Sequence, residues 1–326
     1  MLDIQHLSLA IPLEGQAVLA VSDLSLQLQA GKVLALVGES GCGKSLTAQS
    51  LLRLGEFQGV SKVAGDILLH NQSLFSMPDK QLRQVRGGSV AMIFQEPMTA
   101  LNPVFSIGSQ ILEVIQLHTN LDKKEAQQRA LTLLADVGLQ NGESLMAQYP
   151  DALSGGMRQR ILIAMAMAGN PAFIIADEPT TALDVSVQKR IIALLRSLQQ
   201  DKGLGMLLVT HDFGLVAEMA DDVAVMYAGE IIEQASVNDI FDKPAHPYTK
   251  ALMNCRPEAV GQGGQLTVIP GNVPAPGAWA KGCRFQKRCE FATKECEIHV
   301  SLDHWREDTE HGTHVARCVH AQRHVG

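Results

Sequence analysis

A glycine-rich segment that ends in lysine and serine is the clearest chemical signal in the sequence. It reads GESGCGKS over residues 38–45 and fits the pattern G-x-x-x-x-G-K-[ST]. Glycines allow the backbone to curl closely, so that successive N–H groups point at one anion in front of a helix. Lysine adds a positive charge at the β- and γ-phosphates, and the serine hydroxyl is a Mg²⁺ ligand. We therefore predict a nucleoside triphosphate site made of Gly38, Glu39, Ser40, Gly41, Cys42, Gly43, Lys44, Ser45 and Leu46.

An apolar run that ends in two acids is the second signal. Residues 173–176 are Phe-Ile-Ile-Ala, and Asp177 and Glu178 come directly after them. A triphosphate site needs a carboxylate beside Mg²⁺ and a base that activates the attacking water. We expect Asp177 to hold Mg²⁺ through water and Glu178 to act as the general base. On its own such a segment is equally consistent with a solvated strand end, and the glycine-rich segment favours the catalytic interpretation.

Both signals come after short apolar runs of the kind that form buried strands. Residues 33–37, 90–94, 173–176 and 206–209 are continuous aliphatic or aromatic runs, typical of parallel strands buried on both faces. Helical patterns separate them, which predicts an α/β fold with a parallel sheet. The long helical pattern predicts an inserted α-helical subdomain at about residues 98–168. Residues 1–30 alternate apolar and polar, which predicts an N-terminal β subdomain.

Four further motifs resemble those of the ATP-binding cassette (ABC) ATPases, and they occur in the family's order. The sequence LSGGMRQR at 153–160 resembles the signature motif, Gln95 the Q-loop, residues 182–184 the D-loop and His211 the switch histidine. The resemblance covers about residues 1–245. It implies a P-loop NTPase core, ATP and Mg²⁺ as cofactors, and two such domains that sandwich two nucleotides, each glycine-rich loop facing the signature of the other domain.

The resemblance also implies a role for each of these residues. Ser154, Gly155 and Gly156 would contact a γ-phosphate bound by a second subunit, and His211 would reach the γ-phosphate. Gln95 would contact Mg²⁺ or the attacking water and relay the nucleotide state to a transmembrane partner. The structural alternatives are a loop before a helix, a buried core histidine and a plain polar loop residue.

Two positions add to this comparison. Asp184 belongs to the implied nucleotide site and is also suited to cap the next helix. Ile11 stands where the family places an aromatic side chain that stacks on adenine, and residues 1–56 contain no aromatic residue. We therefore predict weak discrimination of ATP from other nucleoside triphosphates, or adenine contacts supplied by the partner subunit.

The C-terminal residues narrow the resemblance to one group of ABC ATPases. Residues 244–249, 270–274 and 282–289 resemble the tail of peptide/nickel-type ABC importer ATPases. This implies a C-terminal extension at 246–326 and import of peptides, with nickel or another small solute as the alternative. The implied partners are a homologous ATPase subunit, identical or not, two transmembrane permease subunits and, indirectly, an extracytoplasmic substrate-binding protein.

The extension also concentrates cysteine and histidine. Disulfides are disfavoured in a cytosolic ATPase, and the spacing contains no C-x(2–4)-C pair of the kind typical of zinc sites. Iron–sulfur clusters accept more varied spacings. Together with the family resemblance, this spacing predicts a four-iron four-sulfur cluster held by Cys283, Cys289, Cys296 and Cys318. Zinc and reduced structural thiols remain alternatives. We expect a solvated polar tail, or otherwise a weak metal-handling role, for His299, His304, His311, His314, His320 and His324.

Composition limits the remaining possibilities. The 326 residues are 46% hydrophobic, which excludes disorder as the main interpretation, and the net charge of −7 disfavours nucleic acid as a partner. The longest apolar run, residues 161–168, is too short for a membrane span, and no signal-peptide pattern opens the chain. We expect a peripheral protein at the cytoplasmic face of the inner membrane. The rival classes are a soluble ABC ATPase of DNA repair or translation and a redox-sensing regulator.

Overall fold

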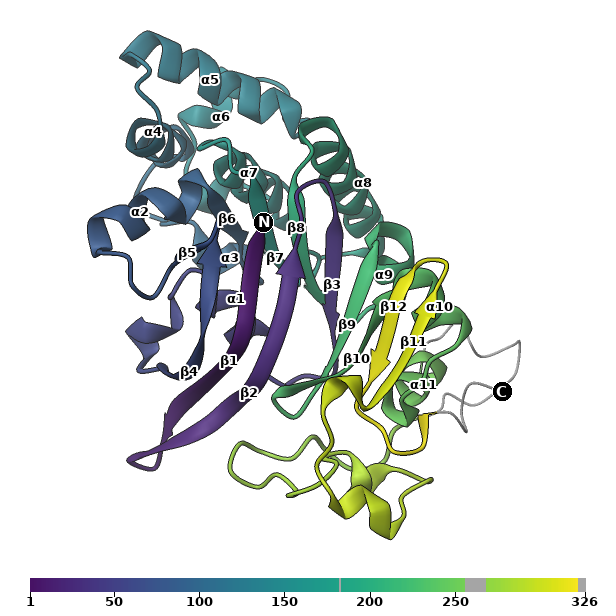
Figure 1. Ribbon diagram of the computed structural model, residues 1–326. Coiled ribbons are helices and arrows are strands. Elements are labelled where there is room, and N and C mark those ends of the chain that lie inside the picture. The colour runs from purple at the N-terminus through teal and green to yellow at the C-terminus, as the bar shows by residue number, and fades with distance from the viewer. Residues whose placement is uncertain (182, 256–267, 322–326) are drawn as a thin grey trace. The chain divides into compact units, whose positions relative to one another are not determined.

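The computed structural model describes residues 1–181, 183–255 and 268–321, and the chain forms two compact units (Figure 1). The first unit contains residues 1–28, 33–75 and the chain from 209 onward. The second contains residues 29–32 and 76–208. The C-terminal extension therefore belongs to the same unit as the glycine-rich segment, although more than 200 residues separate them in sequence.

An antiparallel sheet forms one part of the first unit. Its strand order is β2 (Gln16–Leu28), β1 (Leu2–Leu13), β4 (Ser61–Leu69) and β5 (Gln72–Ser73). A two-residue turn with positive φ at both positions, Glu14 and Gly15, joins β1 to β2, as tight hairpins require. Alternating apolar side chains of β1 and β2 are buried, so the prediction of half-buried N-terminal strands is confirmed.

The second sheet segment of this unit carries the glycine-rich segment. The strand order is β11 (Trp305–Thr309), β12 (Gly312–Ala316), β10 (Glu230–Ser236), β9 (Asp222–Tyr227) and β3 (Val33–Val37). Strands β3 and β9 are parallel, with Val37 opposite Val225. All five residues of β3 are buried, which confirms the predicted strand.

The described residues of the first unit also form four α-helices. They are α1 (Lys44–Ser50), α9 (Phe213–Met219), α10 (Val237–Asp242) and α11 (Pro247–Asn254). Tyr227, Tyr248 and Phe285 pack edge-on in the core, with ring centroids 4.6–5.3 Å apart. Since Phe285 belongs to the extension and Tyr227 to β9, the extension shares the hydrophobic core of strands β3 and β9.

The second unit combines parallel strands with a helical group. Strands β6 (Val90–Ile93) and β7 (Phe173–Asp177) pair in parallel, and β8 (Gly205–Thr210) lies beside β7. Helices α2 (Asp79–Gly88) and α8 (Val185–Lys202) flank the strands in sequence. Between β6 and β7 the chain forms α3 (Pro97–Ala100), α4 (Ile107–His118), α5 (Lys123–Asp136), α6 (Gly142–Met146) and α7 (Gly155–Met167).

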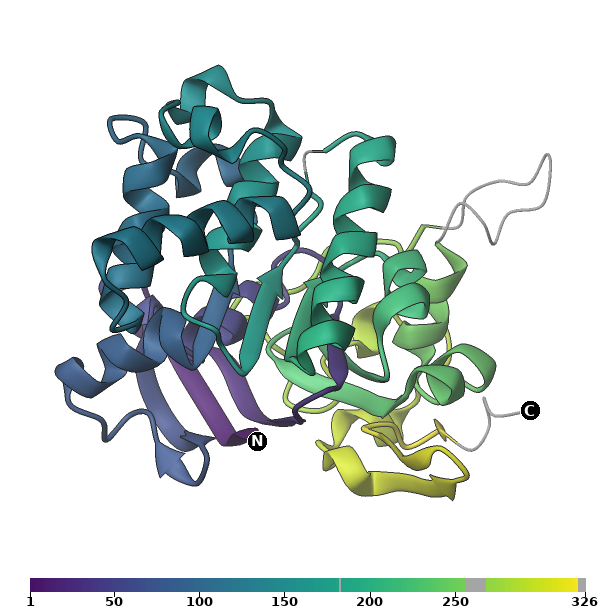
Figure 2. The same ribbon diagram turned by 90° about the horizontal axis from the view of Figure 1, so that it is seen from above.

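The helices between β6 and β7 form one group in both views (Figures 1 and 2). Helix α5 packs against α4 and α7, and a capping box of Asp122 and Glu125 fixes its start. The mixed α/β character is as predicted, and the boundaries at residues 98, 168 and 245 stay predictions. Among the described residues, no helix is both long and apolar enough to span a membrane.

Candidate nucleotide-binding and catalytic site

Residues 38–45, here called the phosphate loop, connect β3 to α1 in the first unit. Gly41 and Gly43 have φ of +82° and +110°, values that favour glycine. A Cβ atom at Gly43 would lie 2.7 Å from Met226 Cε, and one at Gly38 would collide with the Met226 carbonyl oxygen. A Cβ at Gly41 would meet nothing within 4 Å. The loop is therefore tightly packed against β9 at both ends and open between them, which fits a bound phosphate.

Lys44 begins helix α1 and turns back over the loop. Its Nζ donates to the carbonyl oxygens of Gly38 (2.8 Å) and Glu39 (3.0 Å), and the residue is only 5% exposed. The first hydrogen bond of the helix runs from Thr47 N to Gly43 O, so the N–H groups of the first turn face the loop. The Lys44 ammonium group and the N-terminus of helix α1 thus lie together at the phosphate loop, as the sequence predicts.

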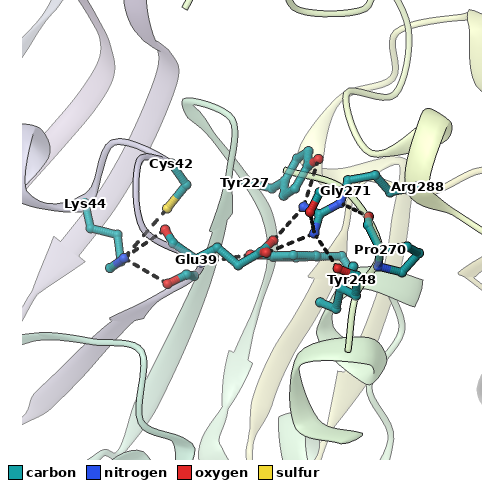
Figure 3. Close-up of polar contacts among 10 residues, drawn as sticks. Glu39, Cys42, Lys44, Tyr227, Tyr248, Pro270, Gly271 and Arg288 are labelled. Atoms are coloured by element: carbon teal, nitrogen blue, oxygen red, sulfur yellow. Dashed lines mark hydrogen bonds and ion pairs between the residues drawn. The ribbon is translucent and has the colours of Figure 1, made fainter. Parts of the chain in front are cut away.

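Cys42 and Glu39 are the loop residues whose contacts the pattern does not foretell. Burial raises the pKa of the Cys42 thiol, which is 1% exposed. A small buried side chain therefore fits this position. The Glu39 carboxylate forms an ion pair with Arg288, and its backbone N–H donates to the Tyr248 hydroxyl (Figure 3). Arg288 lies in residues 282–289, which resemble the tail of the importer ATPases, yet no sequence signal connects it to the phosphate loop.

In the second unit, β7 ends at Asp177 and places Glu178 directly after it. Asp177 and Glu178 are 2% and 9% exposed, so neither is a solvated strand end. Gln95 Nε2 donates to Glu178 Oε2 (2.9 Å), and Thr181 Oγ1 donates to the same oxygen (2.9 Å). Glu178 also has φ of +46°, a conformation that costs free energy in a non-glycine residue and clusters at functional sites. The predicted base and the predicted Q-loop glutamine are therefore in contact.

Thr181 is a functional candidate that sequence reasoning missed. Its only sequence signal is its place three residues after Glu178. Its hydroxyl holds the same carboxylate oxygen as Gln95 does, which leaves the orientation of Glu178 defined from two sides.

The signature segment begins helix α7 in the same unit. Ser154 is the N-cap, and its Oγ accepts from Met157 N at 3.4 Å. A Cβ atom at Gly156 would lie 2.8 Å from Val187 Cγ1, so this glycine permits a close approach to the start of α8. Gln159 Nε2 donates to Pro179 O at 2.8 Å, which ties α7 to the segment after Glu178.

Asp184 caps helix α8, as expected. Its Oδ1 accepts from Val187 N (2.9 Å) and Ser186 Oγ (2.7 Å), and these hydrogen bonds lower the pKa of its carboxyl. Ala182 of the predicted D-loop lies outside the described residues. His211, in the first unit, is exposed and comes directly after β8, so the alternative of a buried core histidine is wrong. Its contact with a γ-phosphate stays a prediction.

No aromatic ring compensates for Ile11 on its own strand. Ile11 pairs with Val18 across the hairpin of β1 and β2 and is half-buried. Weak discrimination of ATP from other nucleoside triphosphates stays a prediction.

The four C-terminal cysteines are buried or half-buried within the extension. Cys283 N donates to the carbonyl oxygen of Cys296 at 2.8 Å. Burial, reinforced by the neighbouring thiols, raises the pKa of Cys283 to about 12 and that of Cys318 to about 11. Within residues 1–181, 183–255 and 268–321, no group of three or more His, Cys, Asp or Glu side chains is placed to hold a metal ion.

The predicted iron–sulfur cluster is therefore not supported, and neither is the zinc alternative. Metal ligation requires thiolates, and burial raises the pKa of the Cys283 and Cys318 thiols. The geometry fits the third alternative, reduced structural thiols. Iron and acid-labile sulfide measured after anaerobic purification test this point directly.

The expectation of a solvated histidine tail is wrong for two residues. His314 is 1% exposed and its Nε2 hydrogen-bonds to Glu233 Oε1 at 2.7 Å. His320 is 4% exposed and its Nε2 hydrogen-bonds to Thr293 Oγ1 at 2.8 Å. Both side chains therefore lie in the packed interior of the extension and not in a solvated tail. His324 lies outside the described residues.

Comparison with known proteins places this geometry in a family. The family model described as "ABC transporter" matches residues 21–181, and the model described as "Oligopeptide/dipeptide transporter, C-terminal region" matches residues 232–296. The oligopeptide transport ATP-binding protein AppD of Bacillus subtilis is 47% identical over 277 residues, 85% of this chain and 84% of AppD. The chain belongs to the ABC transporter ATP-binding proteins. It is an ABC ATPase of P-loop fold.

Other relatives and solved structures agree with this assignment. A Brucella abortus protein named for peptide import and ATP binding is 42% identical over 332 residues, 98% of this chain and 97% of that protein. The dimeric structure of MJ0796, a bacterial ABC transporter cassette, matches with a TM-score of 0.65 and 25% identity, over 73% of this chain and 99% of the cassette. Cassette cbiO1 of Clostridium perfringens matches with a TM-score of 0.63 and 25% identity, over 74% of this chain and 90% of cbiO1.

Proposed function

We propose that this ABC ATPase binds Mg-ATP and hydrolyses it to power the import of peptides through a membrane transporter. The observation that carries peptide import is the match of residues 232–296 to the C-terminal region of oligopeptide/dipeptide transporters. The names of the relatives, which refer to peptide transport and import, support the same cargo. The working site is the cytoplasmic face of the inner membrane, with the chain bound peripherally to its permease.

The proposed chemistry assigns a task to each part of the chain. The phosphate loop and Lys44 bind the phosphates, since open backbone and a buried ammonium group are available there. Ser45, Gln95 and Asp177 are the residues proposed to hold Mg²⁺, which would stabilise the charge that develops on the phosphates. Glu178 accepts a proton from the attacking water.

The hydrogen bonds around Glu178 support its assignment as the base. Gln95 and Thr181 both donate to Oε2, which holds in one orientation the carboxylate that is proposed to receive the proton. Because Gln95 contacts this carboxylate, a movement of Gln95 caused by a permease would change the position of the base. Gln95 is thus the proposed relay between nucleotide and cargo pathway.

The proposed active form is a dimer of two ATPase subunits bound to two permease subunits. Ser154, Gly155 and Gly156 of one subunit contact the γ-phosphate held by the other, with Asp184 and His211 as further site residues. The match to a cassette solved as a dimer supports the pairing. ATP-driven closure of this dimer moves the permease, and hydrolysis reopens it.

Reconstitution tests the cargo. The tagged chain is purified from detergent-solubilised membranes with whatever permease subunits accompany it, inserted into vesicles and supplied with the substrate-binding protein. We expect ATP-dependent uptake of a labelled oligopeptide and no uptake with Glu178→Gln. Uptake of nickel ions without peptide uptake would replace the cargo assignment, and co-purification of ribosomes or DNA instead of permeases would overturn the transport function.

A further inference from the structure

Glu39 places a carboxylate inside the phosphate loop, where the ligand is itself an anion. The guanidinium group of Arg288 meets this carboxylate with two parallel contacts, Nη1 to Oε2 at 2.7 Å and Nη2 to Oε1 at 2.9 Å (Figure 3). The Arg288 side chain is 6% exposed and that of Glu39 is 28% exposed. Such paired, charge-assisted hydrogen bonds fix orientation as well as charge.

The remaining donors of Arg288 are held by its own surroundings. Its Nε donates to Pro270 O at 2.8 Å, and Nη2 also donates to the carbonyl oxygens of Ile269 and Gly271. Its Nη1 approaches the Tyr227 hydroxyl at 3.4 Å. The guanidinium group is therefore fixed by residues 269–271 and by the end of strand β9, and it is not free to move with the loop.

The backbone of Glu39 continues the connection toward the lysine. Its N–H donates to the hydroxyl of Tyr248 at 2.9 Å, and that side chain is fully buried. Its carbonyl oxygen accepts from Lys44 Nζ. One residue of the loop is thus held by two groups from beyond residue 245, Arg288 and Tyr248, and itself contacts the ammonium group that binds phosphate.

Loss of the Arg288 contact would leave an uncompensated negative charge in the loop. Like charges repel strongly where solvent is partly excluded, and an unpaired Glu39 carboxylate would oppose a triphosphate in the same loop. With Arg288 in place the pair is neutral overall. The bidentate geometry also directs the carboxylate toward the extension.

We propose that Arg288 is a positioning residue of the nucleotide site, through which the folded C-terminal extension sets the affinity of the phosphate loop for Mg-ATP. It acts by neutralising Glu39 and by holding the loop backbone. This inference rests on the proposed function, in which the loop binds Mg-ATP.

The test compares Mg-ATP binding to the full chain carrying Arg288→Gln, Glu39→Gln or both substitutions. We expect Arg288→Gln to raise Kd and KM about tenfold, within the ~5–150-fold range usual for coupled sites, while kcat at saturating Mg-ATP changes less than about twofold. The double variant regains affinity to within about threefold of the unsubstituted protein, because removing the stranded charge removes the repulsion. Added salt reduces the defect of Arg288→Gln, since it screens partly exposed charges.

Two further variants separate positioning from mere support of the fold. Arg317 is also buried in the extension, where its Nε donates to Ile231 O and its Nη1 to Val300 O. Arg317→Gln lowers the melting temperature but leaves the Kd for Mg-ATP unchanged. Arg288→Lys keeps the positive charge but cannot form the two parallel hydrogen bonds, and it gives an intermediate Kd. This variant tests the role of Arg288 if Arg288→Gln does not fold.

The outcomes separate this inference from the proposed function. Equal weakening by Arg288→Gln and the double variant overturns the neutralisation of Glu39, and equal weakening by Arg317→Gln overturns a specific role for Arg288. If the unsubstituted chain itself does not bind Mg-ATP, the proposed function fails instead.

Discussion

Replacing Glu178 by glutamine removes the proposed base while leaving its surroundings intact. Gln95 Nε2 and Thr181 Oγ1 both donate to Oε2, each at 2.9 Å. The amide oxygen of a glutamine accepts the same two hydrogen bonds, so the side chain keeps its place and Mg-ATP binding changes less than about threefold. Proton abstraction is lost, and general-base catalysis contributes ~10²–10⁴-fold, or about 3–5 kcal/mol of the barrier.

The assay measures phosphate release at saturating Mg-ATP beside equilibrium binding of Mg-ATP. Glu56→Gln is the matched control, because it makes the same substitution at a partly exposed carboxylate, which forms an ion pair with Arg53 at 2.8 Å, and exposed pairs contribute little. Phosphate release by Glu178→Gln within threefold of the unsubstituted protein would show that another group activates the water. A parallel loss of Mg-ATP binding would show that the substitution disturbs the site as a whole.

Three further predictions concern adenine recognition, pH and the extension. Kd values for Mg-ATP and Mg-GTP should agree within about threefold, and Ile11→Tyr should tighten ATP binding by the ~1–3 kcal/mol of a stacked base; a strong ATP preference of the unsubstituted chain contradicts this. Burial lowers the pKa of His118, so the unfolded chain binds the proton more readily and stability falls as pH drops below ~6.5. The difference in unfolding free energy between pH 7 and pH 5, measured by urea titration, should be smaller for His118→Gln than for the unsubstituted protein. An unchanged difference rejects the assignment. Glu233 is fully buried and accepts hydrogen bonds from two backbone N–H groups and His314, so Glu233→Ala should cost about 3 kcal/mol or more in urea unfolding, and a loss below 1 kcal/mol contradicts it.

The parts of the site that sequence predicts are those encoded within a few residues. The phosphate loop needs glycine where φ is positive, and its lysine is the first residue of helix α1. The conformation of residues 38–45 is therefore determined by these residues themselves. The buried strand β7 is likewise recognisable as an apolar run, and the position of the acids at its end results from its direction. The caps at Ser154 and Asp184 are equally local.

The contacts that sequence does not predict are long-range and specific. Arg288 lies 249 residues from Glu39, and nothing local distinguishes it from a solvated arginine. His314 and His320 resemble members of a polar tail in the sequence, yet each is buried by a partner that the chain brings from 81 or 27 residues away. Periodicity describes which face of an element is buried, whereas pairing between distant polar groups depends on how the elements pack.

The proposed role of Arg288 would explain why a phosphate loop can contain an acidic residue. A loop built only to bind triphosphate would be served better by a neutral residue at position 39, because its carboxylate opposes the ligand. In its proposed role Arg288 makes the carboxylate compatible with binding, and Arg288 is itself held by the carbonyl oxygens of residues 269–271 beside the Tyr227 hydroxyl. If Arg288 acts as proposed, nucleotide affinity depends on a folded extension, and the segment that matches the C-terminal region of oligopeptide/dipeptide transporters supports the phosphate loop from within the same unit.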